Sequence, residues 1–211
     1  MELNIPEALR YLGVTNDPEG LISQQLSGLA EKLQCRITPR IRWRCFPLSD
    51  DSPLQLPSSA LVHKMLADAS HAAVMLVTLG AEFDIWVRQE QARDMSRAVM
   101  LDALGSVYVE AACDQAEQDI LTRFPGKFLT DRFSPGYGDF PLETQQLLMK
   151  LTGAGSIGVT LTDSLLLNPQ KSVTAVVGIA DTPQMARIRG CAFCTMNKTC
   201  TLRKAGTPCH V

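Results

Sequence analysis

An arginine and a tyrosine flank a proline–glycine pair in residues 132–139, RFSPGYGD. A Pro-Gly pair is typical of a tight turn, and glycine lets the backbone approach a ligand closely. Arg132 offers a planar fork that suits a carboxylate, and Tyr137 offers an aromatic face that attracts a positive centre such as a sulfonium. The run therefore predicts one of two things. It is either a site for an amino-acid-like ligand or a turn in which Arg132 is a cap and Tyr137 packs at the loop edge.

Residues 132–141, RFSPGYGDFP, resemble the S-adenosylmethionine-binding signature of the activation (reactivation) domain of cobalamin-dependent methionine synthase. That signature reads Arg-x-x-Pro-Gly-Tyr and is followed by a helix that starts with proline. Residues 157–164 (IGVTLTDS), a proline at 169 and a Ser-Val pair at 172–173 follow in the order of that family's downstream elements. The resemblance covers nearly the whole chain and is strongest over residues 110–173. On these motifs the chain is identified as a short, free-standing member of the family.

The resemblance implies roles for individual residues. Arg132 would bind the carboxylate of S-adenosylmethionine with Tyr137 beside it, and Glu110 would face the ammonium group. The backbone around Phe133 and Ser134 would meet the adenosyl part. Glu110 lies about 60° around its helix from Val107, at the margin of an apolar stripe, where a solvated acid is the alternative interpretation. The expected cofactor-binding residues are Glu110, Arg132, Phe133, Ser134, Gly136 and Tyr137.

The chain also departs from the family pattern. Asp163 stands where the family usually has glutamate, and residues 174–177 (TAVV) replace an aromatic-rich strand. The second departure leaves open which residues close the ligand pocket on that side. Asp50 and Asp51 are the two possibilities for the family's other acidic contact.

The resemblance also implies a mechanism in which this chain contributes no catalytic residue. In the family, the domain holds S-adenosylmethionine over an inactive cob(II)alamin while a separate protein delivers one electron, and the methyl group passes to cobalt. The work of such a domain is positioning. Nothing in the sequence resembles the homocysteine, folate or cobalamin modules. The cobalamin would therefore belong to a partner, either a corrinoid-binding protein or a methionine synthase lacking its own activation domain. The alternatives are a non-catalytic regulatory module that binds S-adenosylmethionine or a metal, and a corrinoid-independent methyltransferase.

Four of the seven cysteines crowd into the C-terminus, at Cys191, Cys194, Cys200 and Cys209. A Cys-x-x-Cys pair with two further thiolates could hold zinc or an iron–sulfur cluster. A cluster could feed the electron for reactivation, whereas zinc would be structural. Free thiols, or a disulfide formed on purification, are the alternatives. The other cysteines are predicted to be small buried hydrophobes, at positions 35, 45 and 113.

The composition is that of a soluble protein, with a formal net charge of −2 and a pI of about 5.9. This balance argues against nucleic acid and anionic membrane surfaces as partners. The sequence has neither a membrane-spanning apolar run nor the layout of a secretion signal, so a cytoplasmic location is expected.

Helices and strands do not alternate along the chain, which predicts an α+β domain with a twisted, mostly antiparallel sheet packed by helices. We expect an activation-domain-like unit over residues 1–181 and a basic, cysteine-rich tail over 182–211. Residues 94–121 should form the longest helix, with an apolar stripe through Met95, Val99, Leu104, Val107 and Ala111. Other helices are expected at 6–12, from 16–19 onward, and at 58–69, 82–91 and 141–151. Strands are expected at 37–46, 72–79, 157–161 and 172–179.

Overall fold

The computed structural model describes residues 1–184, 198–200 and 204. Its main sheet has four antiparallel strands in the order β1–β2–β6–β3. These are β1 (Arg40–Pro47), β2 (Ala69–Thr78), β6 (Ser172–Ala180) and the short β3 (Phe128–Leu129). The expected α+β class with a mostly antiparallel sheet is confirmed.

The two central strands, β2 and β6, are buried on both faces. Met75 and Val77 point to one side of the sheet, while Val74 and Leu76 point to the other, and all four are fully buried. Strands covered on both faces read as continuous apolar runs, which is why residues 72–79 predict a central strand.

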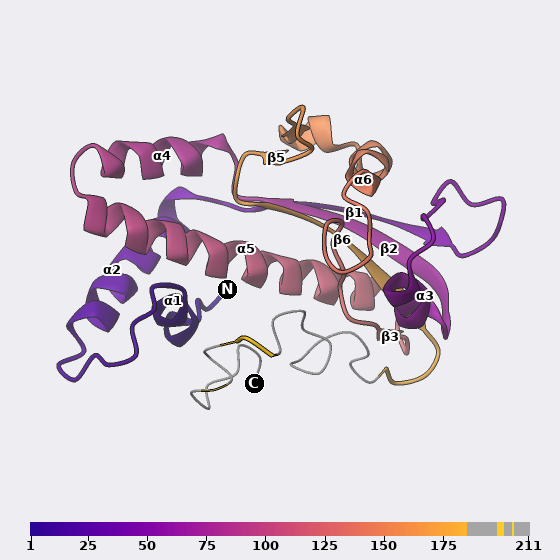
Figure 1. The fold of residues 1–211 in the computed structure, drawn as a ribbon, viewed down its shortest axis with the longest axis horizontal. Coiled ribbons are helices and arrows are strands. Elements are labelled where there is room, and N and C mark those ends of the chain that lie inside the picture. The colour runs from indigo at the N-terminus through magenta and orange to yellow at the C-terminus, as the bar shows by residue number, and fades with distance from the viewer. Residues whose placement is uncertain (185–197, 201–203, 205–211) are drawn as a thin grey trace.

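One layer of helices is built around α5 (Met95–Arg123), a 29-residue helix that lies along the sheet (Figure 1). Three further helices pack against it: α1 (Ile5–Tyr11), α2 (Leu21–Arg36) and α4 (Ala81–Gln91). The expected apolar stripe is wrong at its start, since Met95 is 60% and Val99 is 50% exposed. Because α5 is covered by the sheet on one side and by helices on the other, its buried residues are not confined to one stripe.

The opposite face of the sheet carries α3 (Ala60–Leu66), α6 (Thr144–Thr152) and the 3₁₀ turn η1 (Ala154–Ile157). A small hairpin of β4 (Thr160–Leu161) and β5 (Leu167–Asn168) follows. The strand expected at 157–161 shrinks to β4, because Gly158 ends η1 in a left-handed conformation with φ 73°. The helix expected at 141–151 begins at Thr144, three residues later than expected.

Two further expectations are corrected. The helix expected to start at residues 16–19 begins at Leu21, after Gly20 in a left-handed conformation. Asp17 still accepts hydrogen bonds from the backbone of Ile22 (3.3 Å) and Ser23 (2.8 Å), so it satisfies N–H groups of the first turn from outside the helix. Cys35 is exposed rather than buried, and Cys113 is fully buried as expected.

Among the described residues, no helix is long and apolar enough to cross a membrane.

Candidate functional site

Residues 132–139, called here the Arg132 turn, follow β3 along the side of β6 that faces away from β2. Thr130 exchanges hydrogen bonds with Gly178, and Phe133 pairs with Val176 through backbone bonds of 3.0 and 2.9 Å. Successive residues of extended chain point to opposite faces of a sheet. Arg132 therefore reaches the α5 layer, while the ring of Phe133 lies in the other layer.

The Arg132 turn is fixed from within and from α3. The amide of Gly136 donates to the carbonyl of Phe140 at 2.8 Å, and Phe133 stacks on Phe140 with ring centroids 5.8 Å apart. Gly138 has φ 55°, and a Cβ there would lie 2.4 Å from Leu61, so this position requires glycine. The turn is therefore a rigid platform for the side chains at its surface.

Asp139 ties the Arg132 turn to the start of α3. Its carboxylate accepts from the Ser59 hydroxyl at 2.6 Å and from the Ala60 amide at 2.5 Å. The hydrogen bond from Ser59 lowers the pKa of Asp139, and the bonds from the Ala60 and Leu61 amides add to this effect. Asp139 is therefore a structural clamp rather than a ligand contact.

Arg132 is bound by three carboxylates of α5, and these four residues are called here the carboxylate cluster. Its guanidinium lies 2.5 Å from Glu110, 2.6 Å from Asp114 and 2.8 Å from Glu117. The three acids are spaced i, i+4 and i+7, which places them on one face of a helix. The Arg132 side chain is only 13% exposed, so it lies beneath the acids rather than in solvent.

The electrostatics of the carboxylate cluster favour an added cation. Three carboxylates against one guanidinium leave a surplus of two negative charges. Burial alone would lower the pKa of Arg132, but the hydrogen bond with Asp114 and the charges of Glu110 and Glu117 outweigh it, and the pKa is raised. Arg132 thus stays charged at every physiological pH. The neighbouring Cys113 has its pKa raised by burial, so its thiol remains neutral.

Two exposed tyrosines accompany the cluster. Tyr137, on the Arg132 turn, is 68% exposed, and Tyr11, at the end of α1, is 47% exposed. Burial raises the pKa of Tyr11, and the charges of Glu7 and Glu110 and the nearby Tyr137 raise it further. Glu110 and Tyr137 are therefore each within electrostatic reach of Tyr11, although α1 and the turn are far apart in the sequence.

The structure brings together some of the predicted site residues. Glu110 and Arg132 are in direct contact, and Tyr137 is exposed on the same turn as Arg132. Tyr137 and Glu110 both act electrostatically on Tyr11. Phe133 uses both its backbone N–H and its C=O to pair with Val176, which leaves Ser134 as the nearer backbone for a ligand on this turn. Asp50 lies in a groove beside α3, apart from the α5 acids.

Sequence reasoning missed three residues of this site. The signal for Asp114 and Glu117 was visible, since they follow Glu110 at helical spacing. Tyr11 had only a weak signal, as an aromatic residue at the end of a short amphipathic helix.

Three of the four predicted metal-binding cysteines, Cys191, Cys194 and Cys209, lie outside the described residues. Cys200 is described and is half-buried. Within residues 1–184, 198–200 and 204, no group of three or more His, Cys, Asp or Glu side chains could hold a metal ion. The metal site remains a prediction.

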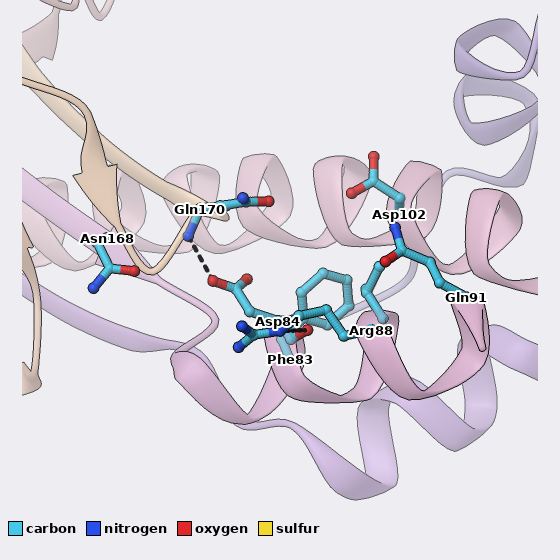
Figure 2. Close-up of a pocket in the computed structure, with 8 residues that line it drawn as sticks. Phe83, Asp84, Arg88, Gln91, Asp102, Asn168 and Gln170 are labelled. Atoms are coloured by element: carbon cyan, nitrogen blue, oxygen red, sulfur yellow. Dashed lines mark hydrogen bonds between the residues drawn. The ribbon is translucent and has the colours of Figure 1, made fainter. Parts of the chain in front are cut away.

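A polar cleft of about 310 Å³ lies between α4, the first turns of α5 and the loop before β6 (Figure 2). The backbone N–H of Gln170 donates to the Asp84 carboxylate at 2.9 Å (Figure 2). The ammonium of Lys171, next in the chain, donates to the Asp102 carboxylate at 2.9 Å. These contacts fix the loop to the two helices. Asp102 precedes Glu110 by about two helical turns, so this cleft is separate from the carboxylate cluster.

The fold and the site together define an α+β domain in which a rigid Pro-Gly-Tyr turn at a sheet edge faces an acidic stripe of a long helix. A solved structure with this fold is the MetH reactivation domain bound to AdoHcy (S-adenosylhomocysteine). It matches with a TM-score of 0.59 over 99% of this chain and 79% of that chain, at 16% identity. This likeness shows a shared fold. No protein-family model matches the chain, and no curated protein matches it.

Proposed function

We propose that this protein binds S-adenosylmethionine between the Arg132 turn and α5 and presents it to a corrinoid carried by a separate protein. The observation that carries the proposal is the direct contact of Arg132 with Glu110, on a turn whose Tyr137 is exposed and, like Glu110, acts on Tyr11. They meet in a fold similar to that of a domain crystallised with AdoHcy.

The charges of the carboxylate cluster fit this ligand. S-adenosylmethionine carries a sulfonium, an ammonium and one carboxylate, which gives it a net positive charge opposite to the surplus of the cluster. One carboxylate oxygen of Glu110 accepts a hydrogen bond from Arg132. Because 46% of the Glu110 side chain is exposed, the carboxylate can also accept a hydrogen bond from an ammonium group. Tyr137 and Tyr11 offer aromatic faces for the sulfonium.

The ligand carboxylate would compete for Arg132, whose guanidinium is already shared among three acids. Asp114 is the most exposed of them, at 68%, and is therefore the partner that a ligand carboxylate displaces at the smallest cost. Arg132 would keep Glu117, which is 22% exposed, as its buried anchor. In this arrangement Arg132 orients the amino-acid end, and Tyr137 defines where the sulfonium lies.

The corrinoid and the single electron belong to partner proteins. The partner is a corrinoid-binding protein or a methionine synthase without its own activation domain, together with an electron donor. The corrinoid supplies the nucleophilic cobalt, and this chain supplies position and orientation. Metal at Cys191, Cys194, Cys200 and Cys209, either zinc or an iron–sulfur cluster, is a separate proposal that metal analysis of anaerobically purified protein tests.

Calorimetric titration with S-adenosylmethionine tests the binding step. Glu110→Gln removes a charge-assisted hydrogen bond and should weaken binding at least tenfold. Tyr137→Leu should weaken S-adenosylmethionine binding about twofold to fivefold and AdoHcy binding less, because AdoHcy lacks the sulfonium. Glu82→Gln, at an exposed acid on α4, is the matched control and should leave affinity unchanged. If Glu110→Gln binds as tightly as the parent protein, the ligand does not lie at the carboxylate cluster.

Methyl transfer separates this function from its alternatives. The proposal expects S-adenosylmethionine to methylate a corrinoid protein only when a one-electron reductant and this chain are both present. Methylation of a small molecule without any corrinoid would instead identify an independent methyltransferase. Binding with no transfer to any corrinoid protein would identify a regulatory module.

A further inference from the structure

The open edge of the sheet carries a row of arginines. Among the described residues, β1 is one of the two edge strands of the main sheet, the short β3 being the other, and Arg40, Arg42 and Arg44 occupy alternate positions along it. All three are exposed and lie on the same face, about 7 Å apart. Between them, Ile41 and Trp43 point to the other face and are half-buried.

The arginines are held by uncharged groups. Arg42 donates two hydrogen bonds to the Ser156 hydroxyl, at 2.8 and 3.2 Å, and Arg44 donates to the carbonyl of Leu151 at 3.4 Å. The Arg40 guanidinium lies against Gly80 and Gly158. None of the three takes part in an ion pair within the described part of the chain.

This face is also free of acids in the sequence. Residues 37–49 and 144–162, which supply β1, α6 and η1, contain no Asp or Glu. They hold four cations: Arg40, Arg42, Arg44 and Lys150. In a chain with a net charge of −2, this face is therefore locally positive, and it lies on the side of the sheet opposite the carboxylate cluster.

We propose that β1 is a docking edge for an extended acidic segment of a partner protein, which adds to the sheet as a fifth strand. An edge strand presents unpaired backbone N–H and C=O groups to such a segment. Residues opposite each other on neighbouring strands lie about 5 Å apart. A segment with alternating acidic and apolar residues would therefore set each carboxylate against an arginine and each apolar side chain against Ile41 or Trp43.

Other occupants fit the charges less well. A second copy pairing through β1 would bring arginine against arginine, and like charges directly opposite one another are destabilising. The C-terminal residues of the same chain carry Arg187, Arg189, Lys198, Arg203 and Lys204, and no acid follows Asp181, so they have the wrong sign.

The test uses the full chain and a dye-labelled peptide of alternating Glu and Val, with binding read by fluorescence anisotropy. Arg42→Glu with Arg44→Glu should weaken binding at least tenfold, as should raising the salt from 0.05 to 0.5 M. The control is the double variant Arg88→Glu and Arg93→Glu, in which one exposed arginine lies in α4 and the other just after it. It makes the same charge change away from β1 and should have little effect on binding. Arg42→Lys with Arg44→Lys keeps the charge and should retain most of the binding, which separates docking from loss of folding.

The peptide's pattern and hydrogen exchange then test the geometry. A peptide of the same composition with its glutamates in one block should bind more weakly, and the alternating peptide should slow amide exchange within residues 40–47. Equal binding of both peptides, or no protection of β1, overturns strand addition. Tighter binding of a single-stranded oligonucleotide at the same arginines overturns the choice of a protein partner.

Discussion

Replacing Arg132 with methionine should destabilise the protein by about 3 kcal/mol at pH 7. Methionine keeps the buried aliphatic volume but leaves three carboxylates on one helix face without their cation. Losing one partner of a buried ion pair costs about 3–5 kcal/mol, whereas an exposed pair contributes about 0–1 kcal/mol. Glu110 and Asp114 are 46% and 68% exposed and Glu117 is 22% exposed, so the sum falls at the lower end of the buried range.

The dependence on pH distinguishes charge from packing. The raised pKa of Arg132 keeps its guanidinium charged over the whole pH range of the experiment, so acid does not change the charge that the substitution removes. Free carboxylates are protonated near pH 4. Below that pH the repulsion in the Arg132→Met protein disappears, and the difference from the parent protein should fall to about 1 kcal/mol or less.

Urea denaturation at pH 7 and pH 3.5, followed by circular dichroism, measures both differences. Adding Glu117→Gln to Arg132→Met should restore part of the stability at pH 7, because it removes one of the repelling charges. A loss that is the same at both pH values would mean that Arg132 acts through packing alone. If Arg132→Met lowers the free energy of unfolding by less than about 1 kcal/mol at pH 7, solvent screens the charges of the carboxylate cluster as it does in exposed ion pairs.

Three further outcomes are expected. Asp139→Asn should lower the Tm at pH 7. The pKa of Asp139 is lowered from 3.8 in the folded protein, so its stabilisation is complete above pH 3.8 and is lost as the pH falls through the lowered pKa; calorimetric scans across pH should show the difference shrinking in that range. Gly105→Ala should cost about 1–3 kcal/mol in urea denaturation, since the new Cβ would lie 2.3 Å from the Phe83 ring. In native protein, peptide mass mapping after iodoacetamide should find Cys35 labelled and Cys113 protected, because burial raises the pKa of Cys113 and blocks access.

The sequence predicted the fold class and most elements because those depend on local signals. The apolar run of β2, the glycine after it and the Asp94 cap of α5 each mark a boundary without reference to the rest of the chain. The exposed Met95 shows the limit of this reasoning. The spacing of apolar residues identifies a helix. Which faces of that helix are buried depends on how many elements pack around it, and α5 has neighbours on both sides.

The candidate site was predicted only in part for a similar reason. Arg132, Tyr137 and Glu110 stand out by motif, but the choice of Asp114 and Glu117 as partners of Arg132 depends on the angle at which the turn meets α5. Tyr11 comes to Glu110 only because α1 packs on α5. Such contacts between distant segments have no local signal in a single sequence.

The pairing of β2 with β6 has a consequence for how the protein is made. Ser172 begins β6 94 positions after β2 ends at Thr78, yet the two strands pair along nearly their whole length at the centre of the sheet. At synthesis rates of about 5–20 residues per second, β2 waits roughly 5–20 s on the ribosome for its partner. During that time β2 can pair only with β1. The backbone groups along its other edge have no partner strand until β6 is made. A chaperone that binds nascent apolar strands would therefore be expected to contact residues 69–78 during this interval.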